Sequence, residues 1–92
     1  MAPAGPPPSE LHPVVVYGSR DCQHTRAALA WLRARSIPTT FRDVAADPEA
    51  LVEMQTRAQT LGVEARGIPV LEVRGRMLVG FEATHLGYAL ED

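Results

Sequence analysis

The chain is too short and too weakly charged for several classes of protein. Its 92 residues suffice for one domain, and a net charge of −2 with a pI near 5.9 gives no electrostatic reason to expect binding to nucleic acid or to an anionic membrane surface. No apolar run is long enough to span a bilayer, and a single cysteine excludes a disulfide within the chain.

The N-terminal segment differs in composition from the rest. The first thirteen residues contain five of the eight prolines and almost no periodic apolar residues. This predicts a flexible or polyproline-like tail over residues 1–12 and one folded domain over residues 13–92. The segment lacks the basic and apolar regions of a secretory signal, so we expect a soluble, cytoplasmic protein. All nine basic residues are arginine and alanine is abundant, a bias associated with bacteria of high GC content.

A strand, a helix and a second strand are predicted over the first half of the domain. Residues 14–17 form an apolar, mostly β-branched run typical of a central strand, and Gly18 closes it. A helix follows and ends before Pro38, because a proline disfavours helical geometry in the residue before it. Its buried stripe is predicted to comprise Thr25, Ala28, Leu29 and Leu32. Residues 39–44 form the second predicted strand.

The second half is predicted to contain a helix, a hairpin and a final helix. Asp47 followed by Pro48 is typical of a helix start, and Gly62 is a plausible C-cap. The buried stripe of this helix is predicted to comprise Leu51, Met54, Ala58 and Leu61. Apolar runs at residues 70–73 and 76–79, separated by Arg74 and Gly75, predict the hairpin. The final helix covers residues 83–90.

The order of these elements predicts an α/β fold. Strand, helix and strand at the front require a parallel pair with a right-handed crossover, and the hairpin adds antiparallel strands to the same sheet. The result is a four-stranded mixed sheet, β-α-β-α-β-β-α, with helices on both faces. In open sheets of this kind, ligands bind at the carboxyl ends of the parallel strands. The loop after Tyr17, which carries Cys22, lies at that edge.

The surroundings of Cys22 favour a reactive thiol. At a helix start the backbone N–H groups and the helix dipole favour the thiolate. A protonated His24 and the Thr25 hydroxyl would stabilise it further, whereas the charge of Asp21 opposes this and Arg20 partly offsets Asp21. The alternative is a buried structural cysteine. No cluster of histidine, cysteine and carboxylate residues predicts a metal site.

Four short motifs occur together in an informative order. They are the apolar strand at residues 14–17, CQHT at residues 22–25, RGIP at residues 66–69 and GFE at residues 80–82. In order and spacing they resemble the glutaredoxin-like members of the thioredoxin superfamily. The resemblance covers residues 13–92 and implies a thioredoxin-like fold and thiol–disulfide oxidoreductase activity.

The resemblance implies a role for individual residues. Cys22 corresponds to the attacking cysteine, and Thr25 stands where dithiol members have the resolving cysteine, which makes this a monothiol variant. Pro69 corresponds to a cis-proline beside the sulfur, and the preceding backbone pairs with a peptide-like substrate. Catalytic residues would be Cys22, His24 and Thr25, and glutathione-binding residues Arg20, Arg66, Ile68, Pro69, Gly80, Phe81 and Glu82.

Several residues depart from the glutaredoxin pattern. Ser19 stands where classical glutaredoxins have a lysine. Phe81 stands where they have a cysteine, and this Gly-Phe form is closer to NrdH-type proteins. His24 occupies the place of the histidine in oxidising periplasmic C-P-H-C enzymes. The motif C-x-x-T-R also resembles the start of the arsenate-reductase and Spx group, which carries a helical insertion that this chain has no room for.

The predicted activity is the reduction of mixed disulfides through Cys22. Glutathione or another low-molecular-weight thiol would be the co-substrate, with no tightly bound cofactor and no metal. Disulfide-bonded or glutathionylated proteins would be the partners, and we expect a monomer that binds neither nucleic acid nor membrane. The alternatives are a non-catalytic redox-sensing or adaptor domain and an iron–sulfur cluster carrier.

Overall fold

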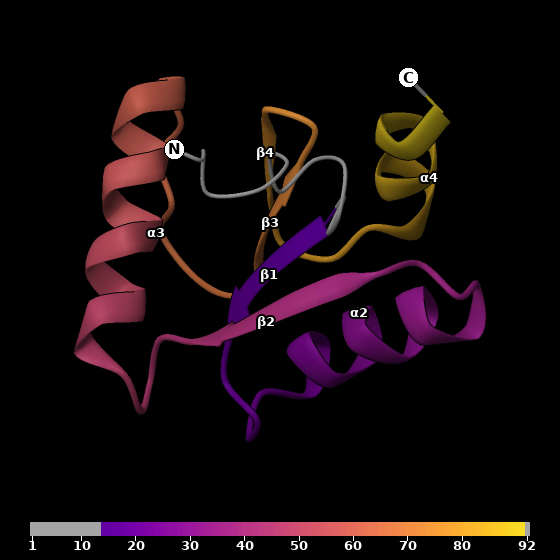
Figure 1. Ribbon diagram of the computed structural model, residues 1–92, viewed down its shortest axis with the longest axis horizontal. Coiled ribbons are helices and arrows are strands. Elements are labelled where there is room, and N and C mark those ends of the chain that lie inside the picture. Colours follow the sequence, from indigo (N-terminus) through magenta and orange to yellow (C-terminus); the bar gives the residue numbers. More distant parts are fainter. Residues whose placement is uncertain (1–13, 92) are drawn as a thin grey trace, which may run out of the picture.

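A four-stranded mixed sheet with strand order β2-β1-β3-β4 forms the centre of the fold (Figure 1). The computed structural model describes residues 14–91, so the predicted tail lies outside the described residues. β1 (Val14–Gly18) pairs in parallel with β2 (Thr39–Asp43) and antiparallel with β3 (Val70–Val73), and β3 pairs antiparallel with β4 (Arg76–Val79). The predicted sheet is therefore confirmed, with β1 in its interior.

Three helices cover the two faces of this sheet (Figure 1). α2 (Gln23–Ala34) and α4 (Ala83–Glu91) lie on one face, and α3 (Pro48–Leu61) lies on the other. Successive residues of β1 point to opposite faces, so Val14 and Val16 enter the core under α2 and α4 while Tyr17 enters the core under α3. No helix within residues 14–91 combines the length and the apolar composition needed to cross a bilayer.

The buried stripe of α3 differs from the predicted one at its start. Met54 and Ala58 are buried as predicted, but Leu51 is 37% exposed and Ala50 is fully buried in its place. Ala50 lies four residues before Met54 and therefore shares its helix face, whereas Leu51 is rotated by about 100° from Ala50. The small Ala50 side chain faces the sheet, and the prediction that Leu51 is buried is wrong.

A charged network that the sequence analysis did not predict joins α3 to the sheet. The Tyr17 hydroxyl donates a hydrogen bond of 2.8 Å to Glu53, and Arg42 of β2 lies 3.0 Å from the same carboxylate. Burial of the phenol, and then its hydrogen bond to Glu53, raise the pKa of Tyr17. Farther along, Arg57 forms a two-pronged ion pair with Glu72 of β3. These contacts fix α3 against three strands.

Candidate active site

Three loops meet at one edge of the sheet. β1 ends at Gly18, β3 begins directly after Pro69, and β4 ends directly before Gly80. Because β3 is antiparallel to both β1 and β4, these three points are neighbours. The Gly80 N–H donates a 2.7 Å hydrogen bond to the Pro69 carbonyl and ties two of the loops together. The loop of Cys22 is therefore at the same edge as the other two motifs.

The loop before α2 is held by its own hydrogen bonds. The Cys22 N–H donates to the Ser19 carbonyl at 3.0 Å, which closes a tight turn, and the Asp21 N–H donates to the Ser19 hydroxyl at 3.2 Å. Arg26 of α2 reaches back and donates to the Arg20 carbonyl at 2.7 Å. Cys22 occupies the N-cap position with extended backbone, so its sulfur lies beside the first N–H groups of α2.

The Cys22 thiol is free, partly exposed and more acidic than an ordinary cysteine. A hydrogen bond from the Thr25 side chain lowers the pKa of Cys22 most, followed by the Thr25 backbone N–H. Partial burial opposes this shift, and the His24 backbone N–H and the charge of Arg26 contribute further lowering of the Cys22 pKa. A lower pKa enlarges the thiolate fraction at neutral pH, and the thiolate is the nucleophile in sulfur exchange.

Thr25 is positioned by a close contact with the end of β1. Its side chain is fully buried, and its hydroxyl accepts a hydrogen bond of 3.4 Å from the Ser19 N–H. A Cβ atom placed on Gly18 would overlap the Thr25 hydroxyl and methyl groups. Glycine at position 18 therefore leaves the space that the Thr25 side chain fills. The sequence analysis treated Gly18 only as the end of a strand, because nothing local indicates this contact.

The positive charge that acts on Cys22 belongs to Arg26, whereas the sequence analysis expected it from His24. His24 is exposed on the first turn of α2 and acts on the sulfur through its backbone N–H. Arg26, which the sequence analysis did not select, supplies the positive charge. The available signal was spacing, since residues four apart on a helix lie on the same face and Cys22 immediately precedes the first helical residue.

The residues implied in glutathione binding are spread over two sides of Cys22. The Ile68–Pro69 peptide bond is cis, as the resemblance implies, and Pro69 is buried. Arg66 is exposed and lies 3.0 Å from Glu64. Arg20 instead extends toward β2: its guanidinium lies 5.6 Å from the Phe41 ring centroid. Because β1 separates β2 from β3, Arg20 is on the opposite side from the cis-proline loop.

The loop between β4 and α4 makes packing and hydrogen-bond contacts with both α2 and α4. Gly80 adopts a left-handed conformation with a φ of 86°, and the Phe81 ring packs edge-on against Trp31 of α2 with centroids 6.3 Å apart. The Glu82 carboxylate accepts a 3.0 Å hydrogen bond from the Thr84 N–H and so caps α4. All three loop residues line a cavity of about 170 Å³. A negative charge thus already stands at the start of α4.

No group of three or more histidine, cysteine or acidic residues within residues 14–91 is placed to hold a metal ion.

The chain is similar to known proteins both in sequence and in fold. The glutaredoxin family model matches residues 14–78. The solved structure of the glutaredoxin grx-1 from Archaeoglobus fulgidus is 15% identical, with a TM-score of 0.71 over 89% of each chain. The thioredoxin-like protein BC3987 is 21% identical, with a TM-score of 0.68 over 84% of this chain and 99% of the other. The protein YFFB (PA3664) is 23% identical, with a TM-score of 0.58 over 84% and 98%. No curated protein sequence matches.

Proposed function

Because the chain belongs to the glutaredoxin family, whose members are thiol–disulfide oxidoreductases, we propose that it reduces mixed disulfides by a monothiol route. The Cys22 thiolate attacks the glutathione sulfur of a protein–glutathione disulfide. A Cys22–glutathione disulfide forms, the original sulfur–sulfur bond breaks, and the protein thiolate leaves and takes up a proton. A second low-molecular-weight thiolate attacks the glutathione sulfur on Cys22, forms an external disulfide and frees the Cys22 thiolate.

The observation that carries this proposal is the position and acidity of Cys22. Its thiol is partly exposed at the start of α2, and hydrogen bonds from Thr25 lower its pKa. Reactive cysteines are recognised by this combination of access and thiolate stabilisation. Thr25 carries no sulfur, so resolution of the adduct requires a thiol from outside. The most direct setting is the cytoplasm, where such thiols keep cysteines reduced.

Glutathione is the proposed co-substrate, and we expect it to be bound weakly. The backbone of Ile68 and the N–H groups of Phe81 and Glu82 would contact it, with its glycyl carboxylate toward Arg66. Two features weaken this site. Ser19 carries no charge where the family has a lysine, and the Glu82 carboxylate caps α4 where the resemblance implies an incoming carboxylate. A like charge at that point costs binding energy.

The proposed route is tested by mass spectrometry of the intact protein. After exposure to oxidised glutathione we expect one glutathione on Cys22, because the lowered pKa of Cys22 favours attack on the disulfide. Added reduced glutathione should then remove it. Parallel samples with other low-molecular-weight disulfides identify the preferred thiol. A chain that stays unmodified under all of them would contradict the proposed function.

The acidity of Cys22 is expected to depend on Thr25 more than on His24. Thr25→Val removes the hydroxyl, which is the largest cause of the lowered Cys22 pKa, whereas His24→Ala keeps the backbone N–H that contributes. We therefore expect Thr25→Val to raise the Cys22 pKa toward its ordinary value, so that exchange requires a higher pH. The titration is followed by the ultraviolet absorbance of the thiolate. Thr25→Ser is the matched control that keeps the hydroxyl, and a larger shift in His24→Ala would contradict this assignment.

A further inference from the structure

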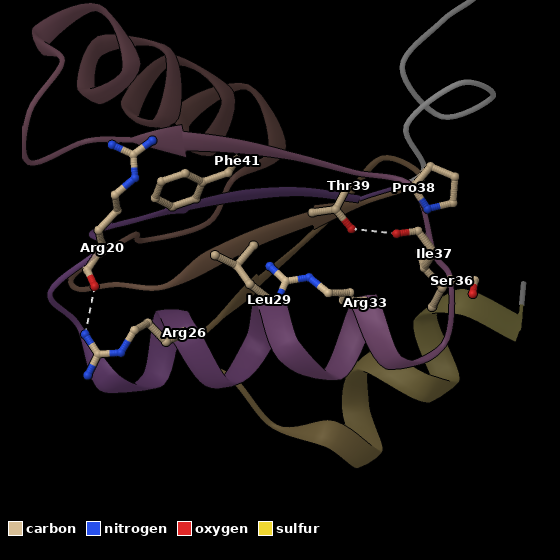
Figure 2. A pocket seen from close by; sticks show the side chains of 9 residues that line it. All are labelled: Arg20, Arg26, Leu29, Arg33, Ser36, Ile37, Pro38, Thr39 and Phe41. Atoms are coloured by element: carbon tan, nitrogen blue, oxygen red, sulfur yellow. Dashed lines mark hydrogen bonds between the residues drawn. The ribbon is translucent and has the colours of Figure 1, made fainter.

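A groove of about 790 Å³ runs between α2 and β2, beside the loop that carries Cys22 (Figure 2). Positions 26, 29 and 33 share one face of α2 because they recur at intervals of three and four residues. Side chains of β2 alternate, so Thr39 and Phe41 face α2. The lining of the groove includes Arg20, Arg26, Leu29, Arg33, Ile37 and Phe41.

The groove combines an apolar floor with a cationic rim. Leu29 and Phe41 form the floor, and both pack against the core under α2. Three arginines line the groove, and none of the acidic side chains in the described part of the chain does. Figure 2 shows Arg20 and Arg26 at the end next to the Cys22 loop, with Arg33 running back along α2 toward Leu29. The groove is therefore suited to a ligand with both carboxylate and apolar groups.

The three guanidinium groups remain available to a ligand. Arg20 is 79% exposed and lies 4.0 Å from the Asp43 carboxylate, at the limit of an ion pair. Arg26 donates through one terminal nitrogen to the Arg20 carbonyl and forms no ion pair with an acidic side chain among residues 14–91. Arg33 contacts no acidic side chain among residues 14–91. The rim thus carries positive charge although the protein as a whole is acidic.

Two features indicate that the groove can accommodate an extended polypeptide close to the Cys22 sulfur. Arg26 lines the groove and is also close enough to act on the charge of Cys22. β2 borders the groove and, within residues 14–91, pairs with a strand on one side only, so its outer backbone can pair with an extended chain. Between Arg26 and Arg33 the helix rises about 10 Å, which is the length of about three extended residues.

From these contacts we propose that the groove binds an acidic, extended segment of the disulfide-bearing protein, with carboxylates on the arginine rim and apolar side chains on the Leu29–Phe41 floor. This inference rests on the proposed function, because the segment is the chain next to the protein cysteine that leaves as a thiolate when Cys22 attacks the glutathione sulfur. It places protein recognition on the β2 side of Cys22 and the low-molecular-weight thiol on the β3 side.

The test measures binding without sulfur chemistry. Full-length protein carrying Cys22→Ser is titrated at low salt with a peptide of three glutamates alternating with leucines, and with the same peptide carrying glutamines. Chemical shifts of the protein give both the affinity and the place of binding. An exposed ion pair strengthens binding by roughly 1.4- to 5-fold, so we expect the glutamate peptide to bind about tenfold more tightly. Shifts should concentrate at residues 26–41, and salt should weaken binding.

Arginine variants locate the interaction. Arg33→Gln should weaken binding of the glutamate peptide by roughly threefold and leave binding of the glutamine peptide unchanged. Arg74→Gln is the matched control, because it removes the same charge from the exposed turn between β3 and β4, away from the groove. Equal losses in the two variants would indicate general attraction and overturn the proposal. Equal affinity for the two peptides would also overturn it.

Other occupants give different results. Inorganic phosphate that produces the same shifts at the same concentration would assign the groove to simple anions. Self-association of the protein alone, with shifts at the groove, would assign it to a second copy; either outcome overturns the proposal. Exchange of wild-type protein with oxidised glutathione is measured separately. If exchange occurs but no peptide binds, only the groove proposal fails, and if peptide binds without exchange, the proposed oxidoreductase function fails.

Discussion

Cys22→Ser is expected to reduce thiol–disulfide exchange to the uncatalysed rate. A serine hydroxyl is not ionised at neutral pH and forms no disulfide, and the 92 residues contain no other cysteine that could replace Cys22. The fold should be unaffected, because the Cys22 side chain is partly exposed and serine also suits the N-cap position at the start of α2. We expect the free energy of unfolding to change by no more than about 0.5 kcal/mol.

The measurement is the release of thiol from a glutathionylated peptide in the presence of excess glutathione. Circular dichroism and thermal unfolding of the same sample show whether the variant is folded. Arg74→Gln is the control that should retain full turnover, because Arg74 lies on the exposed turn between β3 and β4, at the opposite end of these strands from Pro69 and Gly80. Substantial turnover by folded Cys22→Ser protein would exclude the sulfur route altogether.

Gly18→Ala is expected to affect both stability and the acidity of Cys22. The new methyl group would overlap the hydroxyl and methyl of Thr25, which is fully buried and cannot move toward solvent. Overpacking of this kind costs about 1–3 kcal/mol, and each kcal/mol lowers the melting temperature of a domain of this size by about 4–8 °C. Displacement of the Thr25 hydroxyl should also raise the pKa of Cys22 toward its ordinary value.

Two variants separate this contact from a general effect of replacing glycine. Gly87 lies within α4 with open space around it, so Gly87→Ala should stabilise the protein by about 0.5–1 kcal/mol through helix propensity. Combining Gly18→Ala with Thr25→Ala removes the overlapping atoms, so the two changes should be less than additive in unfolding free energy. Strict additivity, or an unchanged thiolate titration in Gly18→Ala, would contradict the proposed contact.

Local signals predicted the elements of this fold well. Asp47 caps α3 by accepting the Glu49 N–H at 3.0 Å, and Gly62 ends it with a φ of 71°, so both bounds of α3 follow from two residues. Arg74 and Gly75 both have positive φ in the hairpin turn that their position predicts. The β-branched run of β1 indicated a central strand, because such a strand is buried on both faces.

Contacts between segments that are far apart in the sequence could not be predicted from local sequence patterns. The burial of Ala50 instead of Leu51 depends on how α3 is rotated against the sheet, and alanine fits either a core or a surface position. The contact of Gly18 with Thr25 depends on the angle between β1 and α2. The groove exists only because α2 and β2 face each other, so Arg33 gave no signal in the sequence beyond its position off the buried stripe.

The buried Thr25 also determines how the oxidised fraction depends on the thiol pool. In the proposed exchange, Cys22 is the single sulfhydryl of the 92 residues, so each modification would consume one external disulfide and release one thiol. At equilibrium, modified and free Cys22 therefore stand in proportion to the ratio of disulfide to thiol. A site with two cysteines releases two thiols when it closes, so its oxidised fraction follows the disulfide divided by the square of the thiol and rises on dilution. The state of Cys22 depends on the ratio alone and is insensitive to the total size of the pool.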